Sequence, residues 1–211
     1  MTVWGPIVLI YLLQGFTLAI YATIIPGPLL AFLLSQALKH GWKRTLPAAF
    51  APLVSDGPII ALVLLILTQT PQRFLDILRL LGGLFILYLA RGAFLAFKES
   101  GATLKAAPKP GRQSLFKAII LNLLNPNPYI FWSVVAGPIL ISGWREEAGF
   151  GLAFVIAFYG TFVAGLAVMI IAFATAGRIH VGAHRGLCIL SAVTLLAFGL
   201  YQIGVGLSAI L

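Results

Sequence analysis

Two proline pairs stand at matching places in this 211-residue chain, Pro26-Gly27-Pro28 and Pro126-Asn127-Pro128, each in the middle of a long apolar stretch. Proline has no backbone N–H and clashes with the preceding turn, so each pair is expected to break a helix. Within a membrane, irregular backbone is tolerated only where it is buried in protein or lines a cavity. Paired breaks in the two halves of a membrane chain therefore predict a binding site between them.

The composition indicates an integral membrane protein. The chain is 61% hydrophobic and 9% charged, with a mean hydropathy of +1.05, whereas charged residues make up about 25% of a soluble domain. The net charge of +9 does not indicate a nucleic-acid partner, because the basic residues lie in short gaps between apolar runs, where they report on membrane topology.

Apolar stretches of at least the roughly 20 residues that a membrane helix needs predict six spans. They cover about residues 5–38, 46–68, 74–97, 116–143, 149–176 and 186–210. The first is longer than one perpendicular span requires, so we expect a strong tilt, an interfacial N-terminal turn, or both, with the first proline pair near the bilayer centre. No basic N-terminal region or cleavage pattern accompanies this segment, so we expect it to stay in the membrane.

Lysine and arginine are distributed unequally between the two sides. The loops after the first, third and fifth spans hold Lys39, Lys43, Arg44, Lys98, Lys105, Lys109, Arg112, Lys117, Arg178 and Arg185, against Arg73, Arg79 and Arg145 on the other side. By the positive-inside rule the first group faces the cytoplasm. This predicts a multi-pass protein of a bacterial inner membrane with both termini outside.

The chain divides into two halves, residues 1–99 and 115–211, joined by a cytoplasmic linker at residues 100–114. An odd number of spans in each half relates the halves by inversion across the membrane plane. The sequence thus predicts an all-α integral membrane protein with six transmembrane helices, arranged as two inverted three-helix repeats with proline-broken helices 1 and 4.

In this arrangement the half-helices that follow Pro28 and Pro128 begin near the midplane, and their N-termini converge. A helix N-terminus presents unpaired N–H groups and about half a positive charge, which suits an anion such as a carboxylate. The alternative is that the prolines only kink helices for packing. The candidate substrate-binding residues at the breaks are Pro26, Gly27, Pro28, Asn125, Pro126, Asn127 and Pro128.

Asp56 is the one carboxylate expected deep in the hydrophobic region, which makes it a candidate functional residue. The other acidic residues, at span ends or in loops, are Asp76, Glu99, Glu146 and Glu147. Asp56 would pair with a substrate ammonium or take up the proton that drives exchange, because desolvation disfavours its charged form. Pro52 and Pro58 predict irregular backbone around it that opens onto a cavity. The alternative role for Asp56 is to cap that backbone break in its protonated form.

Other polar residues in the spans allow two interpretations each. Arg91 either snorkels to the interface or contacts a substrate carboxylate as a gate. Four further polar residues either line a cavity or tie helices together: Asn122, Asn125, Tyr159 and Gln202. We expect function only of Asn125, next to the break. Six glycines predict close helix packing and would also permit a homodimer: Gly82, Gly83, Gly160, Gly165, Gly199 and Gly204.

The sequence lacks the motifs of several other functions. It has no G-x-x-x-x-G-K-[ST] nucleotide-binding loop. Its single cysteine, Cys188, cannot form an internal disulfide or the dithiol pair that a membrane thiol–disulfide electron carrier needs. We therefore expect neither an enzyme nor a bound metal or cofactor.

Five short motifs follow one another along most of the chain: Ile25-Pro26-Gly27-Pro28, Gly41-Trp42-Lys43-Arg44, Asp56, Leu81-Gly82-Gly83 with Tyr88-Leu89, and Leu124-Asn125-Pro126. Their order resembles the LysE/RhtB family of amino-acid exporters, in which P-G-P, Gly-x-Arg, an aspartate, G-x-x-Y-L and Asn-Pro-Lys occur in this sequence. The resemblance implies a six-helix inner-membrane antiporter that exports amino acids or related zwitterions by proton exchange.

The chain departs from the family pattern at sites that bear on the substrate. Leu29 stands where a polar asparagine is frequent, Asn127 replaces the lysine of Asn-Pro-Lys, and Pro52 and Ser55 stand where glycines are common. A less polar or differently charged amino acid is therefore expected. The alternative function is a cation exporter or ion-transport protein of related architecture, with Asp56 as a ligand, although a cation site would need further carbonyl or carboxylate ligands.

Overall fold

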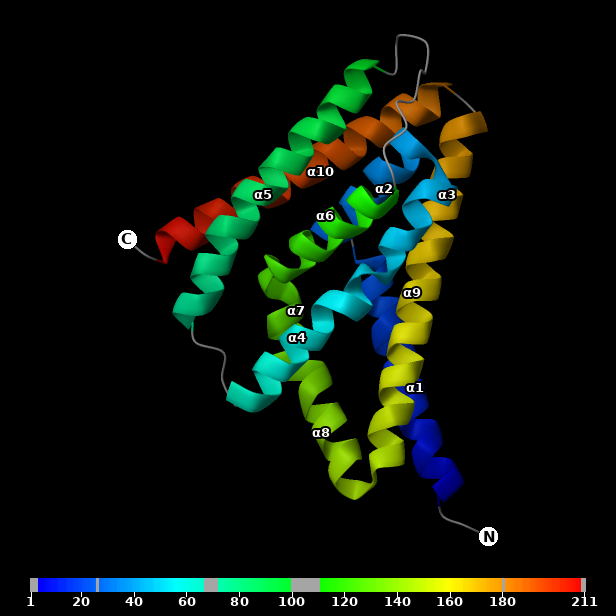
Figure 1. Cartoon of the computed structure of the whole chain (residues 1–211), viewed down its shortest axis with the longest axis vertical. Coiled ribbons are helices and arrows are strands. Elements are labelled where there is room, and N and C mark those ends of the chain that lie inside the picture. Colours follow the sequence, from blue (N-terminus) through cyan, green and yellow to red (C-terminus); the bar gives the residue numbers. More distant parts are fainter. Residues whose placement is uncertain (1–3, 26, 67–71, 100–110, 180, 210–211) are drawn as a thin grey trace.

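The computed structural model describes residues 4–25, 27–66, 72–99, 111–179 and 181–209, which form helices and no strand (Figure 1). The predicted linker is described only from residue 111 onward. In chain order the helices are α1 (Trp4–Ile24), α2 (Pro28–His40), α3 (Trp42–Thr45), the 3₁₀-helix η1 (Leu46–Phe50), α4 (Ala51–Ile66), α5 (Gln72–Glu99), α6 (Gly111–Leu123), α7 (Pro126–Phe131), the π-helical turn η2 (Trp132–Ala136), α8 (Gly137–Glu146), α9 (Ala148–Ile179) and α10 (Val181–Ser208).

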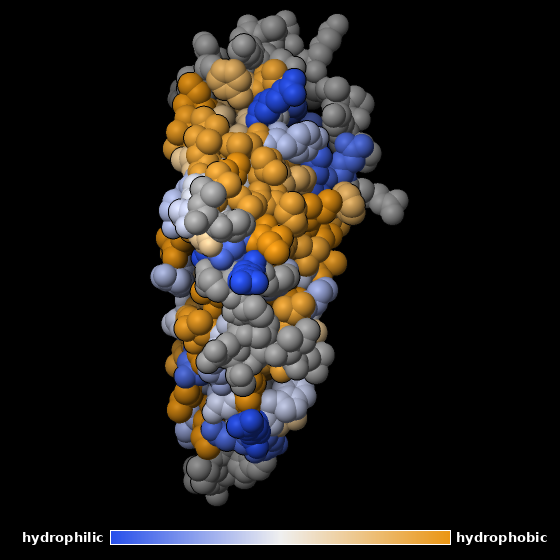
Figure 2. All heavy atoms as spheres, turned by 90° about the vertical axis from the view of Figure 1, so that its left-hand side faces the viewer, coloured by the Kyte–Doolittle hydropathy of each residue, from blue (hydrophilic) through white to orange (hydrophobic). Residues whose placement is uncertain are grey.

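Five helical stretches in the described part of the chain are long and apolar enough to cross a membrane: Gly5–Ile24, Trp42–Leu64, Asp76–Leu95, Ala148–Ala176 and Gly186–Ser208. Large apolar side chains on their outer surfaces are exposed, among them Leu9, Ile156 and Leu200. Figure 2 shows a broad hydrophobic area on one face of the molecule. The chain is thus an all-α integral membrane protein. The predicted span 116–143 consists of the shorter helices α6, α7, η2 and α8.

The first predicted span, residues 5–38, consists of two helices, α1 and α2, which are separated close to Gly27. α1 has 21 residues, about 31 Å at 1.5 Å per residue, which matches the hydrocarbon core by itself. α2 adds 13 residues, and ten of them are buried. The length that the sequence analysis assigned to tilt or to an interfacial turn is therefore a second helix inside the protein, packed against α6, α9 and α10.

The break between α1 and α2 lies beside the middle of α9. Gly27 has an extended backbone (φ −137°, ψ 174°) and precedes the first residue of α2, Pro28, whose missing N–H is not needed at that position. Pro26 lies outside the described residues. Thr23, near the end of α1, packs closely on Gly165 of α9. A Cβ added to Gly165 would lie 2.8 Å from the Thr23 side chain.

The second break separates α6 from α7. Asn125 is extended (φ −87°, ψ 124°) and α7 begins at Pro126. The hydroxyl of Tyr129 donates to the carbonyl of Leu123 at 2.9 Å and satisfies an acceptor at the end of α6. α7 then continues into α8 through η2, where the N–H of Gly137 donates to the Trp132 carbonyl. A Cβ on Gly137 would collide with that oxygen, so this turn requires glycine.

The backbone around Asp56 is regular, contrary to the expectation from its flanking prolines. α4 is continuous from Ala51 to Ile66, and the irregular segment is η1, just before it. Pro52 falls in the first turn of α4, where its missing N–H costs nothing. Pro58 removes one hydrogen bond without ending the helix. Asp56 therefore has no local break to cap.

α5 and α10 pack along each other in opposite directions, with small residues at the contact. A Cβ on Gly83 would lie 2.7 Å from Ile203, and one on Gly199 would lie 2.7 Å from Leu87. A Cβ on Gly82 would come still closer to the Leu124 carbonyl, at the break between α6 and α7. Gly160 and Gly204 do not follow the prediction of close packing, because a Cβ at either position would meet no atom within 4 Å.

Several helix ends lie at one of two opposite ends of the molecule. Figure 1 shows the C-terminal ends of α5 and α9 and the start of α10 together at the top, and the α8–α9 turn near the start of α1 at the bottom. α2 carries Lys39 and His40 in its last turn, whereas α8 carries Arg145 in its last turn.

Candidate functional site

Both helix breaks and Asp56 border one cavity of about 280 Å³, which we call the central cavity. Small-molecule sites usually have roughly 300–1,000 Å³, so this one has the size for a small ligand. Its wall combines polar and apolar side chains from α1, α2, α4, α6, α7, η2 and α9: Tyr21, Ala22, Ile25, Gly27, Pro28, Leu29, Leu30, Asp56, Asn122, Asn125, Asn127, Pro128, Phe131, Trp132, Phe158, Phe162 and Leu166.

Asp56 is held by side chains from two other helices. It is 4% exposed. Asn122 of α6 donates from Nδ2 to Oδ1 at 2.6 Å, and Tyr159 of α9 donates its hydroxyl to Oδ2 at 3.0 Å. The Trp132 side chain is a further hydrogen-bonding neighbour. Ser55 accepts a second bond from Asn122 at 2.8 Å. These donors fix the carboxylate at the edge of the cavity, as burial of such a group requires.

The start of α2 presents backbone donors to the central cavity. Gly27, the residue before the helix, has no side chain, and no side-chain cap is formed there. Pro28 has no N–H, and the Ala31 N–H is bonded to the Gly27 carbonyl. The N–H groups of Leu29 and Leu30 are therefore the free donors of this first turn, where a helix carries its positive partial charge.

The start of α7 is arranged differently. Oδ1 of Asn125 accepts from the Asn127 N–H at 3.1 Å and from Nε2 of Gln202 at 3.5 Å, so the chain's own side chain caps this helix. From sequence the two helix starts were expected to be equivalent. The structure makes the α2 start the more open of the two toward the cavity.

An aromatic wall closes one side of the central cavity. Trp132 is stacked on Tyr159, with ring centroids 6.2 Å apart, and meets Phe158 edge-on at 5.7 Å. Phe131 and Phe162 also pack against Phe158. Trp132 thus stacks on the ring of Tyr159, whose hydroxyl donates to Asp56.

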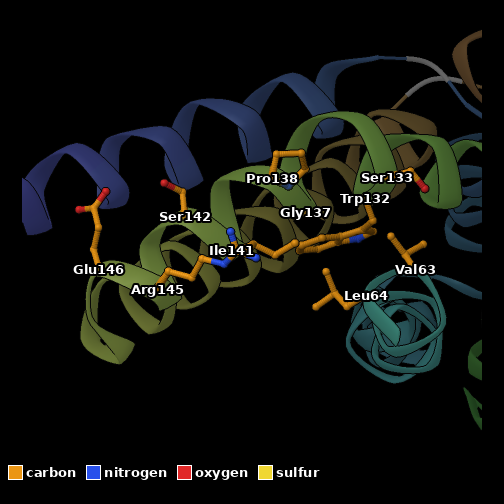
Figure 3. Close-up of a pocket in the computed structure, with 10 residues that line it drawn as sticks. All are labelled: Val63, Leu64, Trp132, Ser133, Gly137, Pro138, Ile141, Ser142, Arg145 and Glu146. Atoms are coloured by element: carbon orange, nitrogen blue, oxygen red, sulfur yellow. The ribbon is translucent and has the colours of Figure 1, made fainter. Parts of the chain in front are cut away.

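Trp132 also borders a second cavity, of about 650 Å³, which we call the outer cavity. Figure 3 shows it between α4 and α8, with Arg145 and Glu146 at the end away from Trp132. Trp132 is 1% exposed. It is the lining residue that the central and outer cavities share.

Arg91 does not line the central cavity. It borders a third space, of about 260 Å³, together with Lys39 and Lys117. The structure therefore separates Arg91 from Asp56, and the interpretation of Arg91 as a gate remains a prediction. Asp76, placed at a span end by the sequence analysis, is 4% exposed and forms an ion pair with Arg79 at 2.6 Å.

Three residues of this site were not assigned a function from sequence: Asn122, Tyr159 and Trp132. Asn122 and Tyr159 gave a signal, because both are polar residues inside apolar spans. Trp132 gave none. Among the described residues no group of three or more His, Cys, Asp or Glu side chains is placed to hold a metal ion.

A helical membrane protein with a buried carboxylate in a cavity between two helix breaks has the architecture of a transporter. The chain belongs to the LysE type translocator family, whose profile matches residues 20–205. The resemblance drawn from the motifs is thereby confirmed. Members of this family are transporters, not enzymes.

The chain is also similar to curated bacterial proteins named leucine efflux protein. It is 25% identical to that of Klebsiella pneumoniae subsp. pneumoniae over 119 residues, which are 54% of this chain and 56% of the relative. It is 29% identical to that of Salmonella typhimurium over 119 residues, with the same coverage of both chains. The similarity thus spans about half the length of these relatives. No solved protein structure matches the chain.

Proposed function

We propose that this protein is a secondary transporter that exports amino acids with an apolar side chain across the bacterial inner membrane in exchange for protons. The observation that carries the proposal is the central cavity, which brings Asp56, the open start of α2 and an aromatic wall to one small space. These three features complement the ammonium, the carboxylate and the side chain of such a substrate.

The charged ends of the substrate have matching partners. The N–H groups of Leu29 and Leu30 would receive the carboxylate, because they are free donors at a helix N-terminus. Asp56 would face the ammonium. Of the predicted site residues at the breaks, Gly27, Pro28, Asn125, Asn127 and Pro128 line the central cavity and would shape it around the substrate.

The apolar wall would select the side chain. Phe131, Phe158 and Phe162 border the central cavity, and Leu29 and Leu166 add aliphatic surface. Asn127 stands where the family has a lysine, so that position adds no charge. The relatives named leucine efflux protein support an aliphatic substrate such as leucine. A cavity of about 280 Å³ suits a molecule of that size better than a larger one.

Asp56 would also carry the coupling proton. It is the carboxylate of the central cavity, and Asn122 and Tyr159 hold both of its oxygens. When Asp56 is protonated, its attraction for the substrate ammonium is lost. Proton uptake from the outside would then favour release of the substrate there, and loss of the proton to the cytoplasm would restore the site.

The transmembrane arrangement is proposed on the same basis. We infer six crossings, with α1–α2 as the first and α6–α8 as the fourth, and an inverted relation between residues 1–99 and 115–211. The antiparallel contact of α5 with α10 supports it, because inversion would relate the last helix of one half to that of the other. Three further points stay predictions: that both termini lie outside, that the protein forms a homodimer, and that Arg91 acts as a gate.

Efflux from proteoliposomes tests the proposal. Vesicles loaded with labelled leucine, lysine, glutamate or rubidium ions would be given a pH gradient, with the unaltered protein compared with Asp56→Asn. We expect gradient-driven efflux of leucine, abolished by Asp56→Asn. The matched control is Asp76→Asn, which alters another buried carboxylate that does not line the central cavity. A flux of rubidium without leucine would contradict the proposal and favour ion transport.

A further inference from the structure

We propose that the outer cavity is a second amino-acid site, in which Arg145 binds the substrate carboxylate, and that Trp132 is the partition between this site and the central cavity. The inference rests on the proposed function and extends it to the path that the substrate takes after leaving Asp56.

Arg145 is placed to act as an anion ligand in the outer cavity. Figure 3 shows its side chain extending along the cavity toward Trp132, while the Glu146 carboxylate is turned away from it. Glu146 accepts a hydrogen bond from the Tyr11 hydroxyl at 3.2 Å. Among the described residues the ion pair present is that between Arg79 and Asp76. No carboxylate of this part of the chain therefore lies within ion-pair distance of Arg145. A guanidinium can bind a carboxylate through two parallel hydrogen bonds.

The rest of the outer cavity suits the same class of ligand. Ser142 adds a polar residue to the lining, and Val63, Leu64 and Ile141 add apolar surface for a side chain. Glu146 lines the same end, and its carboxylate, which now accepts from Tyr11, would have to turn toward the cavity to face the substrate ammonium. The cavity therefore offers both charges and an apolar surface, as a zwitterion with an apolar side chain needs.

Trp132 separates the two cavities and is tied to Asp56 through Tyr159. Its indole borders both spaces, is 1% exposed, and stacks on the ring whose hydroxyl donates to Asp56. Trp132 also begins the π-helical turn η2, and such turns occur frequently at functional sites. A substrate that moves between the cavities has to displace this indole. Its position is therefore suited to respond to the charge or occupancy of Asp56.

The single cysteine of the chain makes the second site testable by labelling. In a Cys188→Ala background, Ser142→Cys would place a thiol in the outer cavity of the protein in proteoliposomes. We expect external leucine, at ten times its Kd, to slow modification by a membrane-impermeant methanethiosulfonate about tenfold by mass action. Ile141→Cys serves as a second reporter if Ser142→Cys does not fold.

Three further variants separate the second site from the central one. Arg145→Gln should abolish the protection by leucine, whereas Arg73→Gln, another exposed arginine that does not line the outer cavity, should retain it. Asp56→Asn should also retain protection while it abolishes efflux. Three results would overturn the proposal: leucine does not protect the unaltered site, protection survives Arg145→Gln, or protection disappears in Asp56→Asn. Failure of leucine efflux in the unaltered protein would instead count against the proposed function.

A cysteine in the central cavity tests the partition. Gly27 lines that cavity, and a Cβ there meets no atom within 4 Å, so Gly27→Cys fits. Without a pH gradient or substrate, we expect external reagent to modify this thiol at least about tenfold faster when Trp132 is replaced by alanine. Trp144→Ala, which truncates an exposed tryptophan of α8, should have no such effect. Equal modification with Trp132 intact would contradict the partition.

Discussion

Tyr159 donates its hydroxyl to Oδ2 of Asp56 at 3.0 Å, although 103 positions separate the two residues in the sequence. Asn122 donates to the other oxygen from a third helix. One carboxylate thus joins α4 with α6 and α9, and so connects the two halves of the chain. On the proposed mechanism, protonation of Asp56 would therefore act directly on contacts between the halves, which is where a transporter built from repeats moves.

Tyr159→Phe should reduce proton-driven leucine efflux about tenfold or more. The substitution removes the hydroxyl but keeps the ring that stacks on Trp132. A hydrogen bond to a charged group contributes roughly 1.5–3 kcal/mol, and 1.4 kcal/mol corresponds to a factor of ten. The initial efflux rate under a fixed pH gradient is the measurement. Tyr201→Phe, at an exposed tyrosine of α10, is the control, and equal rates for both variants would show that the hydroxyl is not used.

Asn122→Leu should destabilise the protein by about 1–3 kcal/mol, because it leaves a buried acceptor of Asp56 without its donor. Thermal unfolding in detergent measures the effect. The same substitution should cost less in an Asp56→Leu background, where the acceptor is absent. An equal cost in both backgrounds would mean that Asn122 acts through packing or through Ser55 rather than through Asp56.

Gly82→Ala should lower the stability by roughly 1–3 kcal/mol, because the added Cβ would collide with the Leu124 carbonyl, which is backbone at the second helix break. Gly204→Ala meets open space in α10 and should be neutral or stabilising by up to about 1 kcal/mol, since alanine favours the helix. Unfolding temperatures of the two variants, measured side by side, test the contrast. The same decrease in both would contradict the close approach at Gly82.

Asn127→Lys should change substrate preference. Asn127 lines the central cavity at the position where the family pattern has lysine, and an added positive charge would oppose the substrate ammonium while attracting an acidic side chain. We expect leucine efflux to fall and glutamate efflux to appear in the same vesicle assay. Asn127→Gln, which lengthens the side chain without a charge, is the control. A preference that both variants leave unchanged would place this residue outside the substrate path.

Several features of this protein could be predicted from sequence because they depend on local properties. Hydropathy located the apolar helices. The missing N–H of proline led us to expect half-helices after Pro28 and Pro128; in the structure α2 begins at Pro28, whereas α7 begins at Pro126, two residues earlier than expected. Asp56 was identified because a carboxylate is unusual in such a run. The expected irregular backbone at Asp56 was wrong for a local reason also, since Pro52 falls in the first turn of α4 and Pro58 is tolerated within it.

The surroundings of these residues depended on tertiary packing. No local pattern pairs Asp56 with Asn122 or Tyr159, which are 66 and 103 positions away. Nor does any pattern place Trp132 between two cavities or Arg91 in a third space apart from Asp56. Local residue properties were enough to predict which segments are apolar, where they break and that Asp56 lies among them. Only the packing of α4, α6 and α9 decided what that charge contacts, because contacts between distant segments exist only once the helices are assembled.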